Sequence, residues 1–206
     1  MAAVLLVHGL GRTPLSLRRL GRRLRRGGYQ PRYFGYVPAV ESFDRILSRL
    51  RARVRELDAL GTPWAGIGHS LGGLLLRSAI AAEAPRHLVH LIMLGTPNQP
   101  PRLARRAAGV RPFRWLTGEC GRRLASTEYY AHLPPPEYPY ALLAGTRGLY
   151  GRWSPFGDTP NDGIVAVAEV PVRREDHVDT FRVSHTFMMN NGAVQARILE
   201  ILGADG

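Results

Sequence analysis

Gly-Ile-Gly-His-Ser-Leu-Gly-Gly, residues 66–73, is the stretch that decides the predicted fold. It follows one short apolar run and precedes another, which predicts a strand that turns sharply into a helix around Ser70. Such a turn strains the serine backbone and needs residues without bulky side chains two positions before and two positions after it. Gly68 and Gly72 meet this requirement. Ser70 is therefore the candidate nucleophile; the alternative is an ordinary helix start with Ser70 as the N-cap residue.

Two residues further along the chain can supply the base and the acid that a nucleophilic serine needs. His185 follows the apolar-rich stretch 178–184, and Asp162 lies in a loop rich in Pro and Gly after the segment 140–145. Both loops follow predicted strands, and open parallel sheets build their sites at the carboxyl ends of strands. The chain order Ser, Asp, His is the order of hydrolases with this type of strand-to-helix serine.

The start of the chain predicts an oxyanion hole. Residues 4–13 form an apolar strand that runs into a loop flanked by glycines, so that the N–H of Leu10 can point toward the serine. Together with the N–H of Leu71, it would stabilise the negative charge of a tetrahedral intermediate. His8 and His69 also lie in these motifs, and the favoured interpretation for both is a structural histidine that hydrogen-bonds its surroundings.

Five segments together resemble the α/β-hydrolase superfamily, and they span nearly the whole chain. They are His-Gly-Leu-Gly-Arg-Thr at 8–13, Gly-His-Ser-Leu-Gly-Gly at 68–73, Leu-Gly-Thr-Pro-Asn at 94–98, Asn-Asp-Gly at 161–163 and Val-Ser-His-Thr-Phe-Met-Met at 183–189. Within the superfamily, the chain is similar to small bacterial lipase-like and esterase-like hydrolases, a group related to class 2 lipases and to GPI inositol-deacylase-like proteins.

The resemblance implies a role for each candidate residue. Ser70 would be the nucleophile, Asp162 the acid and His185 the base of a catalytic triad, with Leu10 and Leu71 as the oxyanion donors. The implied activity is hydrolysis of carboxylic esters through an acyl-enzyme intermediate. The alternatives are acyl transfer or amide cleavage by the same triad, and a non-catalytic binding protein on the hydrolase scaffold.

Other aspartates compete with Asp162 for the role of the acid. Asp179 lies on the strand that leads to His185 and is too close along the chain to reach the far ring nitrogen. Asp158 is only four residues from Asp162, and Asp176 is a third competitor. Position and the resemblance together favour Asp162.

The alternation of strand and helix patterns predicts one α/β domain over residues 1–206, with an about six-stranded, mainly parallel sheet and helices on both faces. Strands are expected near 3–7, 29–36, 64–68, 88–94, 140–145 and 180–183, and helices near 13–26, 42–60, 71–84 and 192–202. The chain opens with a strand, which leaves no residues for the first two strands of a full-size member, so we expect a minimal α/β-hydrolase fold. By resemblance, the second strand lies at the edge beside the first, followed by the third to the sixth.

The region 98–139 breaks this alternation and is predicted to be a lid or cap insertion over the serine. Its aromatic residues favour packing against another surface, and a disordered surface insertion is the alternative. They are Phe113, Trp115, Tyr129 and Tyr130. Its arginines could face lipid phosphates or solvent, and they are Arg102, Arg105, Arg106, Arg111 and Arg114.

The chain is strongly basic, with a net charge of +12 and a pI near 11.0. Every basic residue other than histidine is arginine, a bias that a GC-rich coding sequence produces, and the arginines of the predicted helices lie off the apolar stripes. The sequence has no nucleic-acid-binding module. We therefore expect a small-molecule or lipid ester as the partner, no nucleic acid, and at most weak peripheral contact with an anionic membrane.

The remaining features limit cofactors and location. A single cysteine, Cys120, excludes an internal disulfide and a thiolate metal cluster. Residues 158–163 resemble a calcium loop only superficially, because the alternating ligands and the distal glutamate are missing. We expect no metal and no cofactor. The apolar run 2–7 is too short for a signal peptide and has no basic leader, so cytoplasmic residence is expected.

Overall fold

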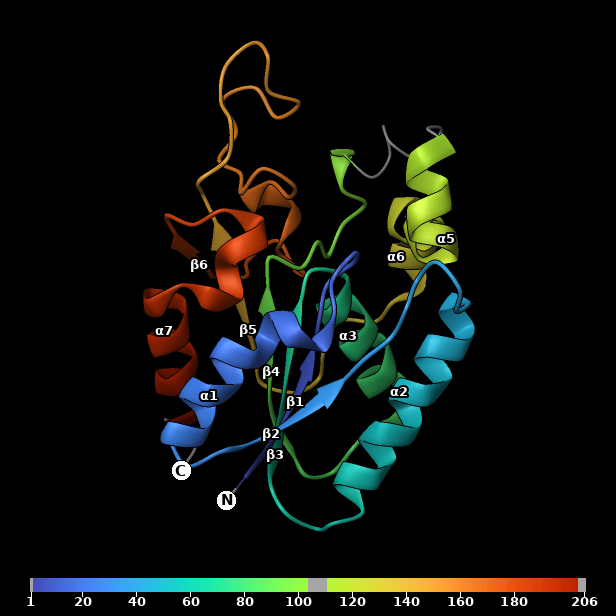
Figure 1. The fold of residues 1–206 in the computed structure, drawn as a ribbon, viewed down its shortest axis with the longest axis vertical. Helices are drawn as coiled ribbons and strands as arrows, with labels where there is room; N and C mark the ends of the chain where they lie inside the picture. Colours follow the sequence, from blue (N-terminus) through green and yellow to red (C-terminus); the bar gives the residue numbers. More distant parts are fainter. Residues whose placement is uncertain (1, 104–110, 204–206) are drawn as a thin grey trace.

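An open sheet of parallel strands forms the centre of the computed structural model, which describes residues 2–103 and 111–203, with side chains for these ranges except 111–117 (Figure 1). Within these residues six strands pair in the order β2-β1-β3-β4-β5-β6, all parallel. They are β1 Ala3–Val7, β2 Gln30–Phe34, β3 Trp64–His69, β4 Leu88–Leu94, β5 Tyr140–Gly145 and β6 Val178–Phe181. This confirms the predicted α/β-hydrolase fold and strand order.

Both faces of the sheet are buried, and β1 shows why. Leu5 and Val7 belong to one core cluster, whereas Val4 and Leu6, which point to the opposite face, belong to the other. The first cluster includes side chains of α2 Phe43–Asp58 and α3 Leu71–Glu83, and the second includes side chains of α1 Arg18–Arg26 and α7 Gly192–Gly203. The sheet therefore lies between two helical layers, which is the arrangement expected when inner strands such as β1 are apolar at every position.

The helix boundaries follow local capping chemistry. α2 begins after Ser42, whose hydroxyl accepts a hydrogen bond from the N–H of Arg45 at 3.2 Å. The helix predicted over 13–26 is divided in two. A 3-10 helix, η1 Pro14–Leu17, precedes α1, which ends where Gly28 adopts a φ of +87°.

The predicted bounds differ from the observed ones mainly at β2 and β6. β2 ends at Phe34, because the chain then leaves the sheet and the N–H of Tyr36 bonds to the ring of His8 at 3.3 Å. β6 begins and ends two residues earlier than predicted. After it, the N–H of Val183 bonds to the carbonyl of Phe181 at 2.7 Å, and this tight turn leads the chain away from the strand direction. The turn precedes the 3-10 helix η3 His185–Asn190.

The segment between β4 and β5 contains two helices that the sequence pattern did not predict, α5 Arg111–Ala125 and α6 Thr127–His132. α5 is interrupted at Gly118, where φ is +54°, which weakens its helical periodicity. The sequence analysis also named side chains here that lie outside the described ones: Arg105, Arg106, Arg111, Arg114, Phe113 and Trp115.

The end of this insertion packs on α3. The hydroxyl groups of Tyr129 and Ser78 are 2.5 Å apart, and the guanidinium of Arg77 donates to the carbonyl oxygens of Leu133 and Pro134. Burial raises the pKa of Tyr129 above its ordinary value. The described residues at the end of the insertion are therefore packed against α3, unlike the disordered insertion that the sequence analysis considered as an alternative.

Candidate active site

Ser70 occupies a strained turn between β3 and α3. Its backbone has φ +53° and ψ −124°, a conformation that a residue with a side chain rarely adopts. A Cβ atom at Gly72 would lie 2.3 Å from the carbonyl oxygen of Val7, and one at Gly68 would lie 2.3 Å from the Cα of Gly73. The two glycines are thus required by close packing, as predicted. Ser70 makes no side-chain capping bond to α3, which argues against the N-cap alternative.

The backbone of Ser70 is fixed from the neighbouring strand. Its N–H bonds to the carbonyl of Leu94 at 2.8 Å, and its carbonyl accepts a hydrogen bond from the Thr96 hydroxyl at 3.1 Å. A Cβ at Gly73 would lie 1.9 Å from that hydroxyl. The sequence analysis placed Thr96 in a motif but gave it no role. Its contact with Ser70 joins segments 26 residues apart and so has no local signal.

Asp162 and His185 form a buried hydrogen-bonded pair. His185 Nδ1 donates to Asp162 Oδ2 at 2.6 Å, and the other carboxylate oxygen accepts from the N–H groups of Ile164 and Val165 at 2.9 and 2.7 Å. The N–H of His185 also bonds to the carbonyl of Asp162 at 2.9 Å. Because the proton of the neutral imidazole is then on Nδ1, Nε2 is left as a proton acceptor.

The three competing aspartates lie elsewhere. Asp176 accepts from the hydroxyl of Tyr140 at 2.6 Å, and Asp179 pairs with Arg197 at 2.8 Å. Asp158 is exposed in the loop before Asp162. Of the four candidate acids, only Asp162 has a hydrogen bond to the ring of His185 among the described contacts.

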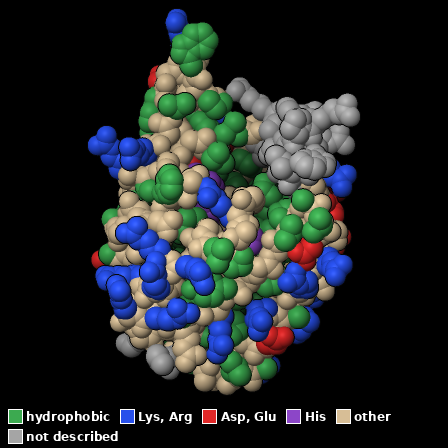
Figure 2. All heavy atoms as spheres, viewed as in Figure 1, with side chains coloured by type: hydrophobic (Ala, Val, Ile, Leu, Met, Phe, Trp, Pro, Cys, Tyr) green, Lys and Arg blue, Asp and Glu red, His purple; other side chains and the backbone are tan. Residues whose placement is uncertain are grey.

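Ser70 and His185 line the same pocket, which has a volume of about 350 Å³. Its other lining residues are mainly apolar: Leu10, Arg12, His69, Pro97, Pro101, Leu103, Leu124, Ile164, Val165 and Thr186. Leu124 comes from α5, so the insertion supplies part of the wall. Figure 2 shows histidine side chains in a hollow near the middle of this face, below the loop that projects at the top of the view.

Two backbone N–H groups are available beside the serine. Leu10 lines the pocket, and Leu71 is the first residue of α3. Within the described part of the chain, neither N–H donates to a protein acceptor. The first N–H groups of a helix are unpaired and carry partial positive charge, which favours a developing anion nearby.

Two buried histidines hydrogen-bond the backbone around the site. His69 Nε2 donates to the carbonyl of His185 at 3.0 Å, and burial lowers the pKa of His69 well below its ordinary value. His8 donates from Nδ1 to Gly9 and accepts at Nε2 from Tyr36, and burial lowers its pKa as well. Both rings are therefore held neutral, in the structural role that the sequence analysis favoured.

Glu169 is a buried carboxylate that sequence reasoning missed. It accepts hydrogen bonds from the N–H groups of Ala166 and Arg102 at 2.9 and 2.8 Å, and its own carbonyl accepts from the N–H of Asn98. These bonds tie the start of the insertion to the loop that carries Asp162. The local sequence around Glu169 has no feature that distinguishes it from an exposed glutamate.

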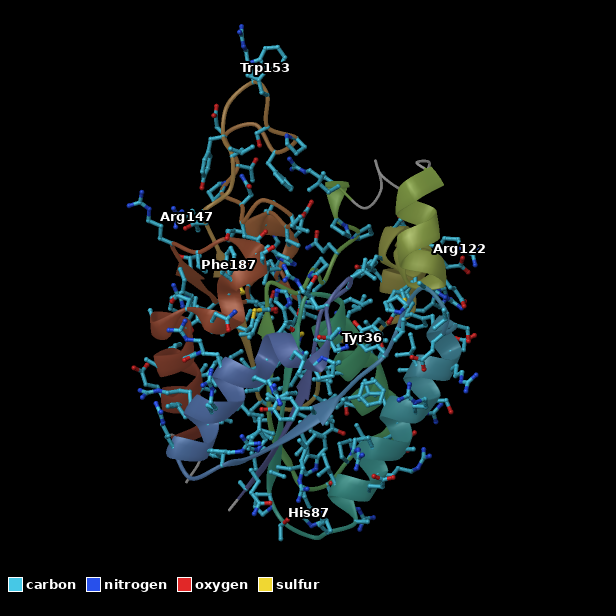
Figure 3. The ribbon with its side chains drawn as sticks, in the orientation of Figure 1. Tyr36, His87, Arg122, Arg147, Trp153 and Phe187 are labelled. Carbon is cyan, nitrogen blue, oxygen red and sulfur yellow. The ribbon has the colours of Figure 1, made fainter. Side chains whose placement is uncertain are left out.

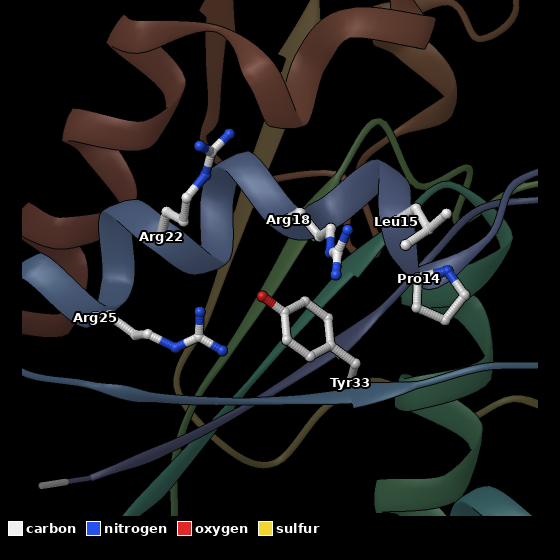
Figure 4. Close-up of a pocket in the computed structure, with 6 residues that line it drawn as sticks. All are labelled: Pro14, Leu15, Arg18, Arg22, Arg25 and Tyr33. Carbon is white, nitrogen blue, oxygen red and sulfur yellow. The ribbon is translucent and has the colours of Figure 1, made fainter.

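A second cavity of about 570 Å³ lies between α1 and the edge strand β2, and it shares no lining residue with the serine pocket (Figure 4). It is lined by Pro14, Leu15, Arg18, Arg22, Arg25 and Tyr33. Within residues 2–103 and 118–203, no group of three His, Cys, Asp or Glu side chains could hold a metal ion.

The comparisons with known proteins agree with this architecture. The model of the Alpha/beta hydrolase family matches residues 4–200. Comparison with curated proteins gave no match. The mature form of lipase BlEst2 from Bacillus licheniformis superposes with a TM-score of 0.79 at 19% identity, over 98% of this chain and 91% of that one.

Two further solved structures share the fold. For phospholipase PlaB from Legionella pneumophila, the TM-score is 0.74 at 19% identity, with 100% of this chain and 59% of that one covered. For a monoglyceride lipase from Saccharomyces cerevisiae, the TM-score is 0.66 at 15% identity, with 98% of this chain and 85% of that one covered. At these identities the likeness shows the fold, and the family match over nearly the whole chain shows the membership: this protein belongs to the α/β hydrolase family.

Proposed function

We propose that the protein hydrolyses carboxylic esters, with Ser70 as the nucleophile, His185 as the general base and Asp162 as the acid that orients His185. The observation that carries the proposal is the joint geometry of the three residues. A strained serine shares a pocket with a histidine whose Nδ1 is bonded to a buried carboxylate at 2.6 Å. This arrangement has the parts and the chain order of a serine-hydrolase triad.

The first step is attack of Ser70 on the ester carbonyl. A neutral hydroxyl is a weak nucleophile, so His185 takes its proton on Nε2 as the new C–O bond forms. The imidazole becomes positively charged, and the buried carboxylate of Asp162 stabilises that charge and holds the ring orientation. Because Ile164 and Val165 bond to its other oxygen, the carboxylate is oriented before substrate binds.

The tetrahedral intermediate places a negative charge on the former carbonyl oxygen. In this proposal the free N–H groups of Leu10 and Leu71 donate to it. His185 then returns its proton to the leaving alkoxide, which leaves an acyl group on Ser70. A water molecule attacks the acyl group with His185 again as base, and this releases the acid and regenerates the serine.

The pocket supports an acyl group of apolar character. Most of the described lining side chains are apolar, and Arg12 is the only arginine among those described. We propose that the acyl chain lies against Leu124 and Pro101, that the insertion acts as a cap over it, and that the Arg12 guanidinium favours esters with a nearby anionic group. The structural neighbours named as lipases and a phospholipase are consistent with a lipid ester.

The test is hydrolysis of p-nitrophenyl esters of increasing acyl length by the parent protein and by Ser70→Ala. We expect turnover that depends on chain length and a loss of at least about 10,000-fold in Ser70→Ala. Ser48→Ala, which changes an exposed serine of α2, is the matched control and should keep full activity. Undiminished turnover in folded Ser70→Ala would refute the proposed nucleophile.

A fluorophosphonate probe separates the remaining alternatives. Labelling at Ser70 without ester hydrolysis would favour acyl transfer or amide cleavage, which use the same acyl-enzyme. Failure to label Ser70 in the folded parent protein would favour a non-catalytic binding protein.

A further inference from the structure

A loop between β5 and Asp162 projects beyond the sheet at the end of the molecule where the strands terminate (Figure 1). We name residues 147–157, Arg-Gly-Leu-Tyr-Gly-Arg-Trp-Ser-Pro-Phe-Gly, the finger. Trp153 lies at its tip in Figure 3, and the tip in Figure 2 carries exposed hydrophobic and basic side chains. The proposed catalytic steps make no use of this segment.

The finger has a defined shape. The N–H of Gly151 bonds to the carbonyl of Gly157 at 3.1 Å across its two arms, and the hydroxyl of Ser154 donates to the carbonyl of Leu149 at 2.7 Å. The Tyr150 hydroxyl donates to the carbonyl of Thr146 at 2.7 Å. These hydrogen bonds hold the conformation without burying the outer side chains.

Large apolar side chains are nevertheless exposed on the finger. Trp153 is 83% exposed, Leu149 is 75% exposed and Tyr150 is 49% exposed, whereas Phe156 of the same loop is buried. Burying such side chains on folding would be favourable, so their exposure on a hydrogen-bonded loop marks a surface for an apolar partner. Trp and Tyr are the residues that prefer the interface between lipid and water.

The charge of the finger limits the choice of partner. It contains Arg147 and Arg152 and no acidic residue. Neither arginine has a carboxylate within ion-pair distance in the part of the chain that the structure describes, and the guanidinium of Arg152 lies 4.8 Å from the centre of the Trp153 ring. Cations next to interfacial aromatic rings match an anionic phospholipid surface.

The finger is joined to the acid of the proposed triad. At its base the N–H of Gly148 bonds to the carbonyl of Asn161 at 2.8 Å, and Asn161 Nδ2 donates to the carbonyl of Leu149 at 3.0 Å. Asn161 directly precedes Asp162, and Ile164, on the same loop, is half exposed and lines the serine pocket. A surface bound by the finger would therefore lie at the end of the molecule that carries the pocket.

We propose that the finger docks the protein on the surface of an anionic phospholipid membrane, with Trp153 and Leu149 in the headgroup region and Arg152 on a lipid phosphate. Among the described residues no helix is long and apolar enough to cross a bilayer. This docking deepens the proposed function, because it would place the serine pocket beside esters in the lipid phase.

The test measures binding of the Ser70→Ala protein to vesicles of phosphatidylcholine alone and of phosphatidylcholine mixed with phosphatidylglycerol. This variant hydrolyses no lipid under the proposed function, so binding is scored separately from turnover. We expect binding to the mixed vesicles and a loss of about tenfold when Leu149→Ser and Trp153→Ala are added together. Arg152→Gln should weaken binding to the mixed vesicles about fivefold and should not change binding to vesicles of phosphatidylcholine alone.

Two control variants address other surfaces. Val40→Ser removes an apolar side chain that is 80% exposed outside the finger and should not change binding. The combination Arg18→Gln, Arg22→Gln and Arg25→Gln removes the basic lining of the cavity beside α1. It should weaken vesicle binding less than the finger variants do. If the α1 variant abolishes binding while the finger variants bind like the parent, the docking site is wrong.

A spectroscopic readout adds an independent criterion. The tryptophan emission should shift to the blue when mixed vesicles are added, and the shift should be absent in Trp153→Phe. No vesicle binding by a protein that hydrolyses soluble esters would overturn the docking and leave the proposed function standing. Vesicle binding without ester turnover in the parent would overturn the proposed function alone. A concentration-dependent dimer that Leu149→Ser removes would show that the finger binds a second copy instead.

Discussion

The Ser70 turn of the candidate site and the finger both contain unusual backbone conformations, but different interactions maintain them. We use floor for the Ser70 turn and the strand ends that contact it. In the floor, a Cβ at Gly72 would lie 2.3 Å from a carbonyl oxygen, whereas a Cβ at Gly151 in the finger, where φ is +86°, would meet nothing within 4 Å. The floor is therefore held by tertiary crowding and the finger by its own hydrogen bonds.

This difference shows where strain can be maintained. Ser70 keeps a φ of +53° because β1, β4 and α3 surround it and leave no room to relax. Within the finger the residues with positive φ are glycines, and its large side chains other than Phe156 are exposed. Catalysis, which needs atoms in fixed positions, suits the rigid floor, and binding to a fluid lipid surface suits the finger.

The largest expected effect separates the acid of the proposed triad from an exposed aspartate next to the finger. Asp162→Asn should lower kcat for p-nitrophenyl esters by about 10,000-fold, because the amide can no longer fix the Nδ1–H tautomer of His185 or stabilise its charge. Asp158→Asn, at an exposed position four residues away, should stay within about twofold. The reverse outcome would remove Asp162 from the proposed triad.

The next effect tests the crowding directly. Gly72→Ala should lower the free energy of unfolding by about 3 kcal/mol, because its Cβ would meet the backbone of β1 and that backbone cannot move without disturbing the sheet. Gly151→Ala should cost about 1 kcal/mol, since only the positive φ opposes it.

Chemical denaturation of both variants provides the measurement. Equal losses of stability would show that the floor relaxes as easily as the finger and would break the comparison. Gly151→Ala should also leave turnover of soluble esters unchanged.

The smallest expected effect concerns pH. Burial holds the pKa of His69 well below its ordinary value of 6.5, so below about pH 6.5 the unfolded chain binds a proton that the folded protein does not. The contribution of neutral His69 to the free energy of unfolding is therefore fully present above about pH 6.5. It decreases as the pH falls, with a slope of up to about 1.4 kcal/mol per pH unit. His8, whose pKa burial also lowers, adds in the same direction.

The corresponding variant is His69→Gln, in which the amide Nε2 can keep the donor to the carbonyl of His185 that His69 Nε2 provides, but does not titrate. Unfolding followed from neutral to acidic pH should show a shallower loss of stability than in the parent. His177→Gln, which changes an exposed histidine, should keep the slope of the parent. An unchanged slope in His69→Gln would mean that the His69 ring is not kept neutral by burial.

Local sequence patterns predicted much of the fold. The bounds of β1, β4 and β5 agree with the predicted strands, because continuous apolar runs that end at Gly or polar residues specify buried parallel strands. The Ser70 turn could be predicted because its requirements lie within five residues of chain. α5 was not predicted, since Pro112 and Gly118 obscure its helical period.

The sequence by itself thus determined the order of the six strands and of the helices α1, α2, α3 and α7, the strained serine turn and the candidate side chains, since each depends on neighbours along the chain. Tertiary structure alone decided that Asp162, and not Asp158, Asp176 or Asp179, bonds to His185 at 2.6 Å. It also decided that Trp153 and Leu149 remain exposed while Phe156 is buried. The physical reason is that hydrogen-bond distances and burial depend on how segments distant in sequence pack together.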